Sequence, residues 1–184
     1  KPENAAYRDA ARKLSGVRDA QAMIECFGAL SSHESTSLSK NLTTKVRKAL
    51  VERRDRITQE HADLPARVEQ VVGELKQARK RIDDWPVDVD DPAELLPGML
   101  KVYKRARKAM ATAYDDPTAE HFHEWRKRVK YHWYHARLLS DLWPKQMKVR
   151  RKPLKQLADH LGDAHDLAVF TETINKSPDT FAGP

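Results

Sequence analysis

Apolar residues recur at helical spacing along nearly the whole chain, and this period limits the fold more than any other feature of the sequence. No segment alternates apolar and polar residues with a period of two, and no Asn-Gly or Asp-Gly pair separates β-branched runs. Only six glycines occur in 184 residues, which also favours helices over a turn-rich β structure. The sequence therefore predicts an all-α protein.

Prolines, glycines and capping residues divide this period into expected elements. Gly16 and Gly162 are expected to form turns, and Pro153 to begin a new helix. Asp116 is the expected N-cap of a helix that has Pro117 at its first position. The expected helices span 7–14, 17–30, 38–61, 68–82, 95–114, 117–142, 154–161 and 163–174, with a serine-rich loop over 31–39 and a frayed tail from Asn175.

The segment from His121 to Leu142 carries an apolar stripe and a cationic stripe side by side. At about 100° per residue, the apolar flank consists of Phe122, Trp125, Val129, Ala136 and Leu139. The cationic ridge consists of His123, Arg126, Lys127, Lys130 and Tyr134. One flank is predicted to pack, whereas the other presents N–H and O–H donors to a row of anionic oxygens.

The cationic spacing recurs on the preceding predicted helix and on the turn or helix that follows this segment. It appears before this segment at Lys101, Lys104, Arg105 and Lys108, and after it at Lys145, Lys148, Arg151, Lys152 and Lys155. A single charged helix face is usually only solvated. Several adjacent basic ridges instead predict a shared cationic surface or groove.

Charge is distributed unevenly along the chain. The formal net charge is +7, although six acidic residues and no basic residue lie between Asp83 and Glu94. This acidic, proline-containing stretch is the expected linker, over 85–94, between a first helical half over 1–84 and a second over 95–184. The first half is expected to hold a helix-turn-helix and a long helical hairpin. The strongly basic remainder predicts an anionic partner.

The cysteine count and the hydropathy indicate a cytoplasmic protein. The single cysteine, Cys26, lies in an apolar run and is expected to be a small buried hydrophobe. No apolar stretch approaches the length of a membrane span, and no signal peptide is recognisable.

An internal repeat accompanies the basic ridges. Residues 10–27 align without a gap on residues 157–174, so that Arg18-Asp19 meets His165-Asp166 and both copies carry a glycine near the middle. The alignment predicts that a helix, a tight turn and a second helix are used twice.

These features together resemble the CHAD family, the conserved histidine α-helical domain. The matching residues are His123-x-x-Arg126-Lys127-x-x-Lys130 with Tyr134, then Leu161-Gly162-Asp163-Ala164-His165-Asp166, the earlier Leu14-Ser15-Gly16-Val17-Arg18-Asp19, and Tyr103-Lys104-Arg105-Ala106-Arg107. The resemblance implies two helical bundles related by a pseudo-twofold axis. It also implies that basic helices line a groove or pore that binds inorganic polyphosphate. On this resemblance, the protein is expected to associate with polyphosphate granules.

The resemblance extends over nearly all of the chain but leaves parts of the family's domain outside it. The first half's own basic helix is expected before Lys1, and the final helix of the second half beyond Pro184. The candidate polyphosphate-binding residues are His123, Arg126, Lys127, Lys130, Tyr134, Tyr103, Lys104, Arg105, Arg107, Lys108, Arg12, Lys13, Arg18, His165 and Lys155.

Two other functions remain open from the residues alone. A basic helical protein can neutralise nucleic-acid phosphates, although few aromatic residues for base stacking are interleaved with the ridges. A metal-dependent phosphohydrolase would use His165 and Asp166, but the aligned copy has Arg18, which is no metal ligand. The eight histidines form no recognised metal-ligand spacing, and no nucleophile motif or catalytic carboxylate pair is found. We therefore predict a binding module without a cofactor, of open oligomeric state.

Overall fold

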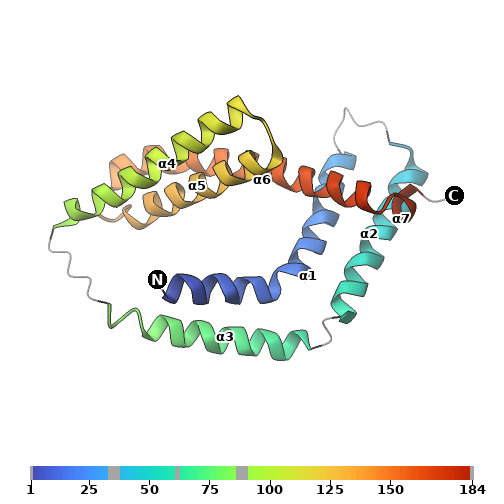
Figure 1. Ribbon diagram of the computed structural model, residues 1–184, viewed down its shortest axis with the longest axis horizontal. Coiled ribbons are helices and arrows are strands. Elements are labelled where there is room, and N and C mark those ends of the chain that lie inside the picture. Colours follow the sequence, from blue (N-terminus) through green and yellow to red (C-terminus); the bar gives the residue numbers. More distant parts are fainter. Residues whose placement is uncertain (1, 33–37, 61–62, 86–90, 183–184) are drawn as a thin grey trace. The chain divides into compact units, whose positions relative to one another are not determined.

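All regular secondary structure in the described part of the chain is helical. The structure is a computed structural model that describes residues 2–32, 38–60, 63–85 and 91–182 (Figure 1). Its elements are α1 (Pro2–Ser32), α2 (Lys40–Glu60), α3 (Leu64–Lys80), the 3₁₀ helix η1 (Pro92–Leu95), α4 (Leu96–Asp115), α5 (Ala119–Leu138), α6 (Pro144–Lys176) and α7 (Pro178–Ala182). The all-α prediction is confirmed.

The helices form two compact units. Unit 1 comprises Lys1–Val87 and Phe170–Pro184, and unit 2 comprises Asp88–Val169. Helix α6 therefore contributes its longer first part to unit 2 and its end to unit 1. Half of the predicted linker, 86–90, lies outside the described residues, and η1 begins within the remainder. The division into duplicated halves stays a prediction. Among the described helices, none has the length and apolar character that crossing a membrane requires.

Unit 1 has its core between α1, α2 and the end of the chain. Met23 and Phe27 of α1 pack against Leu50 of α2, and Phe27 stacks on Phe170 with the ring centroids 5.8 Å apart. Helix α3 lies along the other part of α1, where Nζ of Lys13 is 2.5 Å from Oε1 of Glu74.

Unit 2 is built from α4, α5 and α6, which pack side by side (Figure 1). The apolar flank predicted for α5 is buried: Trp125, Val129 and Leu139 are at most 6% exposed, and Ala136 is fully covered. Ala113 of α4, also fully covered, lets α4 approach α5 closely. Leu161 of α6 completes this core.

The turn predicted at Gly16 is wrong, because α1 continues through it. Residues 2–32 form one helix that bends partway along its length (Figure 1). Ser15 donates its hydroxyl to the backbone oxygen of Arg12 at 3.2 Å. A Ser-Gly pair is a common cause of helix bending, since the hydroxyl competes for a backbone acceptor and glycine tolerates the distortion. The breaker residues thus bend the helix without ending it.

Helix α6 corrects two further predictions. It runs from Pro144 to Lys176, so Pro153 does not begin a helix and Gly162 does not form a turn. The hydrophobic packing of Ala158 and Leu161 between these two positions holds the backbone helical in spite of them. Packing of an amphipathic face commonly outweighs such local preferences.

The start of α5 and the end of the chain also differ from the prediction. The N-cap of α5 is Thr118, whose hydroxyl accepts from the backbone N–H of His121 at 3.2 Å, and not Asp116. The helix ends at Leu138, several residues before the expected stop. The expected frayed tail contains α7, and Phe181 within it is 5% exposed in the core of unit 1.

The uninterrupted α6 predicts that Pro153→Ala stabilises the protein. A proline inside a helix removes one backbone hydrogen bond and crowds the preceding turn, at a cost of up to about 3 kcal/mol. Replacement by alanine is expected to raise the free energy of unfolding by about 1–3 kcal/mol, measured by chemical denaturation. A helix that started at Pro153 would gain nothing from this change, so an unaltered or lower stability would contradict the continuous helix.

The buried His132 predicts a loss of stability on acidification. Its side chain is 7% exposed, and its Nδ1 has no hydrogen-bond partner in the described chain. Burial lowers the pKa of His132 below its ordinary 6.5, and His135 and Arg150 lower it further. The unfolded chain therefore binds more protons below pH 6.5, so this contribution to stability is complete above 6.5 and is lost as the pH falls. The drop in unfolding free energy between about pH 7.5 and 5.5 should shrink in His132→Phe, but persist unchanged in the exposed-site control His160→Gln.

Candidate anion-binding site

The cationic ridge of α5 lies beside the buried flank of the helix, and Arg126, Lys130 and Tyr134 of the ridge face α6. His123, Arg126, Lys127 and Lys130 are half-buried, and Tyr134 is exposed. Because the ridge residues are spaced three or four apart, their side chains lie on successive turns of α5. The buried flank fixes the rotation of the helix about its axis and so determines the direction in which the ridge points. The neighbours of each ridge residue decide what it can bind.

Arg126, Lys130 and Tyr134 line a depression of about 380 Å³ between α5 and α6, which we call the α5–α6 groove. Helix α6 contributes Lys155 to the same groove. The remaining lining residues are Trp133, Ala158, Asp159, Gly162, Asp163 and Asp166. Four of the predicted site residues are thus brought together.

Arg126 lies directly against the backbone of α6 at Gly162. A Cβ atom at position 162 would be 3.6 Å from Nε of Arg126 and 3.7 Å from its Nη2. These are ordinary van der Waals distances, so the guanidinium rests beside α6, and its Nε is buried without a hydrogen-bond partner in the described chain. An unsatisfied buried donor costs about 1–3 kcal/mol, and more when it is charged. The groove therefore holds a cation whose Nε lacks an acceptor in the part of the chain that the structure describes.

Lys155 and Trp133 form one wall of the groove. Nζ of Lys155 is 2.5 Å from Oδ1 of Asp159 and 6.0 Å from the centroid of the Trp133 ring. The guanidinium carbon of Arg137 lies 5.2 Å from the same ring, which also contacts Tyr134 with the centroids 5.0 Å apart. Cation–π contacts of this kind hold flexible cationic side chains near one position.

His123 and His165 extend the ridge by one helical turn beyond Arg126. Their Nδ1 atoms are 3.2 Å apart and their ring centroids 4.4 Å apart. Burial lowers the pKa of His123, the neighbouring His165, Lys127 and Arg126 lower it further, and Glu124 opposes them. At neutral pH His123 is therefore an uncharged donor or acceptor.

Glu124 engages two cations of α5 at once. Its Oε2 is 2.5 Å from Nζ of Lys127, and its Oε1 is 2.5 Å from Nη2 of Arg128. Both contacts lower the pKa of Glu124, the bond to Lys127 most strongly. Lys127 thus has an anionic partner, whereas Arg126 has no ion-pair partner within the described ranges.

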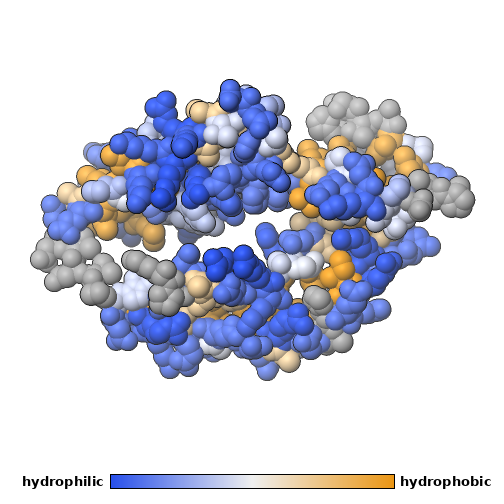
Figure 2. Space-filling model, viewed as in Figure 1, coloured by the Kyte–Doolittle hydropathy of each residue, from blue (hydrophilic) through white to orange (hydrophobic). Residues whose placement is uncertain are grey.

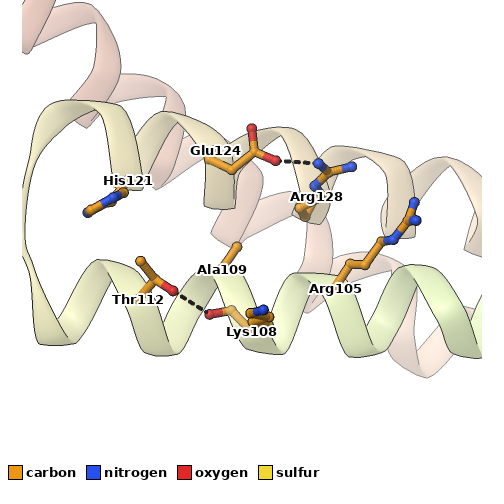
Figure 3. Close-up of a pocket in the computed structure, with 7 residues that line it drawn as sticks. All are labelled: Arg105, Lys108, Ala109, Thr112, His121, Glu124 and Arg128. Atoms are coloured by element: carbon orange, nitrogen blue, oxygen red, sulfur yellow. Dashed lines mark hydrogen bonds and ion pairs between the residues drawn. The ribbon is translucent and has the colours of Figure 1, made fainter.

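The predicted residues of α4 lie on other flanks. Tyr103 and Arg107 line a mainly apolar depression, which Trp125 and Val129 also line. Arg105 and Lys108 line a depression between α4 and α5, which we call the α4–α5 depression (Figure 3). Lys104 is exposed. None of these α4 residues lines the α5–α6 groove.

The surface view separates polar from apolar regions of unit 2. Figure 2 shows the visible face of α4 and α5 as mainly hydrophilic, with hydrophobic residues gathered toward the start of α4. Leu96 and Leu100, 45% and 50% exposed, lie in that first part of α4.

The predicted residues of α1 belong to unit 1. Arg12 is exposed and its Nη1 is 3.6 Å from Oδ1 of Asp9, Lys13 pairs with Glu74, and Arg18 is exposed. They are described within that unit alone, and their part in an anion site stays a prediction.

Several residues of these depressions were not predicted. Trp133, Asp159 and Asp163 line the groove, and Arg128 lies in the α4–α5 depression. A helical projection of α5 would have placed Trp133 beside Arg126 and Lys130, and Arg128 on the opposite side of the core flank. The acids of α6 could not be assigned to the groove while Gly162 was expected to interrupt that helix. Within the described ranges, no three His, Cys, Asp or Glu side chains are placed to hold a metal ion.

The arrangement suits a multiply charged oxyanion. Arginine can chelate two oxygens with its planar fork, lysine acts as a movable point charge, and tyrosine and neutral histidine add hydrogen bonds. The groove holds three cations from two helices, together with carboxylates that keep some of them in position. Such a site favours an anion whose several charges outweigh those carboxylates.

Comparison with known proteins confirms the resemblance that the sequence suggested. A family model described as the CHAD domain matches residues 1–175 of the chain. No curated protein and no solved structure matches it. The match covers all of α1 to α5 and nearly all of α6, including every residue of the α5–α6 groove. The chain belongs to the CHAD family.

Proposed function

We propose that the protein binds inorganic polyphosphate and that the α5–α6 groove is its anion site. The observation that carries this proposal is the position of Arg126, whose buried Nε lacks an acceptor among the described residues and whose neighbours in the groove include Lys130 and Lys155. A phosphate group entering the groove supplies acceptor oxygens to three cations. Charge-assisted hydrogen bonds of this type contribute about 1.5–3 kcal/mol each. The family resemblance points to the same ligand, and an association with polyphosphate granules follows from the proposal.

The length of the ridge favours a chain of phosphates over a single one. From His123 to Tyr134 the ridge extends about 16 Å at the rise of an α-helix. A linear polyanion can contact successive turns of α5, whereas an isolated phosphate reaches only one or two of these side chains. The many contacts of a linear polyanion can then offset the conformational entropy that several long side chains lose on binding.

The carboxylates of the groove set a threshold for binding. Asp159, Asp163 and Asp166 repel any anion that enters, although Asp159 also holds Lys155 in place. An anion with one or two charges gains too little to overcome this repulsion. A polyphosphate chain brings about one charge per phosphate and interacts with all the cations together. We therefore propose that the protein acts as a binding module.

Removal of Arg126 tests the groove directly. In Arg126→Ala, polyphosphate affinity is expected to fall about tenfold or more, which corresponds to one charge-assisted contact. Lys130→Ala should behave similarly, and Arg126→Lys should restore only part of the loss because lysine cannot chelate two oxygens. The measurement is fluorescence anisotropy of labelled long-chain polyphosphate at fixed ionic strength, with circular dichroism as a check on helix content.

The matched controls remove the same charge from unit 1. Arg53 contacts the sulfur of Met23 and Arg54 pairs with Asp55, and both residues belong to unit 1, whereas every lining residue of the groove belongs to unit 2. Arg53→Ala and Arg54→Ala should each change affinity by less than about threefold, as expected for surface charges. Equal losses in all the variants would indicate a diffuse basic surface. Stronger binding of single-stranded nucleic acid than of polyphosphate would favour a nucleic-acid-binding protein instead.

The lowered pKa of His123 predicts tighter binding at lower pH. Its neighbours His165, Lys127 and Arg126 all disfavour the protonated ring, whereas a bound anion favours it. Binding therefore takes up a proton, and the affinity for long polyphosphate should increase as the pH falls below 6.5 toward the lowered pKa. The increase should be smaller in His123→Asn. A pH profile identical in the two proteins would remove His123 from the site.

A further inference from the structure

Two apolar depressions of unit 2 meet at a group of polar side chains. The larger has a volume of about 1050 Å³ and lies between the first part of α4 and the start of α6. The smaller, of about 460 Å³, is the depression that Arg107 and Trp125 line. Of the described residues, three line both depressions: Tyr103 of α4, His132 of α5 and Arg150 of α6. We call these three side chains the polar junction.

The larger depression has mainly apolar walls. Its apolar lining residues include Leu96, Met99, Leu100, Trp143 and Met147. Leu96 and Leu100 are half exposed, and Figure 2 shows hydrophobic residues gathered toward the start of α4. Methionine side chains are flexible and adapt to the shape of an apolar ligand. Exposed apolar surface next to polar residues commonly marks a binding site.

The polar junction carries one positive charge and few internal contacts. His132 is 7% exposed, its Nδ1 has no hydrogen-bond partner among the described residues, and its ring lies against Tyr103 with the centroids 5.5 Å apart. Burial lowers the pKa of His132, and His135 and Arg150 lower it further, so the ring is uncharged at neutral pH. Arg150 is exposed and forms no ion pair within the described ranges. The junction therefore suits a ligand group with a single negative charge.

We infer that the two depressions bind an amphipathic monocarboxylate of the fatty-acid class, with its carboxylate at the polar junction and its hydrocarbon chain against the apolar walls. The guanidinium of Arg150 can chelate both carboxylate oxygens, and the hydroxyl of Tyr103 and a ring N–H of His132 can donate to them. Contact between the chain and the walls removes apolar surface of both from water, which favours binding. The depressions share no lining residue with the α5–α6 groove, so this inference does not depend on the proposed function.

The grouping of the polar side chains favours a small amphipathic ligand over a macromolecule. One head group attached to an apolar chain requires one polar point with apolar surface beyond it, which is the arrangement found here. Small-molecule sites are typically apolar, with a few polar groups that fix the orientation of the ligand. The volume of the larger depression lies at the upper end of the usual range for such sites, about 300–1,000 Å³, so it has room for a long hydrocarbon chain.

Calorimetric titration with laurate, kept below its critical micelle concentration, tests the carboxylate contact. One equivalent should bind, and Arg150→Ala should weaken binding about fivefold or more because it removes a charge-assisted contact. The matched control Arg151→Ala removes an exposed charge from the next residue of α6, which lines neither depression, and should change the affinity less than about twofold. 1-Dodecanol should bind more weakly than laurate, and Arg150→Ala should remove this difference. Equal affinities of the protein for laurate and 1-dodecanol would overturn the inference.

Substitution of the apolar wall tests where the hydrocarbon chain lies. Leu100→Asp places a carboxylate in the wall and should abolish laurate binding. Leu138→Asp changes a leucine that is 75% exposed and lines neither depression, and it should leave the affinity unchanged. Circular dichroism of both variants checks that helix content is preserved. Equal losses in the two variants would overturn the inference.

Three further outcomes would assign the depressions or the ligand differently. Long-chain polyphosphate at saturation should leave laurate binding unchanged, and competition between them would place laurate in the α5–α6 groove and overturn this inference while the proposed function stood. A dimer in sedimentation velocity that Leu100→Asp converted to monomers would make the depressions a subunit interface. An amphipathic helical peptide of leucine and glutamate that bound the protein, was weakened by Leu100→Asp and was not displaced by laurate would make a helix the occupant. Either of these last two results would also overturn the inference.

Discussion

The packing of one flank of α5 between α4 and α6 determines the arrangement of unit 2. Trp125 and Val129 are buried against Ala113 and Leu161, so the rotation of α5 about its axis is fixed. A helix that is locked in this way must display its remaining side chains in defined directions. The cations on either side of the buried flank consequently face α6 in one case and α4 in the other. One hydrophobic contact thus produces two separate electropositive depressions.

The helical period was a sufficient guide to the fold but not to its interruptions. A helical period is carried by many residues of a segment together, so one atypical residue does not hide it. The bounds of α2 to α5 could therefore be predicted to within a few residues. Gly16, Pro153 and Gly162 acted as local signals for breaks, and at each of them the helix continues. Their effect depends on neighbours in space. Gly162, for example, lies inside α6 with Arg126 beside it, and a Cβ atom there would meet the guanidinium only at an ordinary van der Waals distance.

The site residues could be predicted as a ridge but not as pockets. Spacing along one helix identified Arg126, Lys130 and Tyr134 as neighbours, since residues three and four apart share a face. Whether a cation of the ridge has an anionic partner depends on carboxylates outside the ridge, and the spacing of the ridge does not identify them. Glu124 forms ion pairs with Lys127 and Arg128, and Asp159 of α6 forms an ion pair with Lys155. Nε of Arg126, by contrast, lacks an acceptor in the described chain. The cations of the ridge therefore differ in whether they must release a carboxylate before they can bind an anion.

The burial of Phe181 determines where this chain can be shortened. The family match ends at residue 175, and a protein designed from that boundary would omit α7. Phe181 fills part of the core beside Leu50 and Phe27 of unit 1, so its removal would leave a cavity there. Losing a buried phenylalanine side chain costs about 3–5 kcal/mol, a large share of the stability of a small domain. An expression boundary placed after Ala182 keeps Phe181 in the core, whereas one placed at 175 is expected to give a less stable protein for reasons unrelated to its ligand.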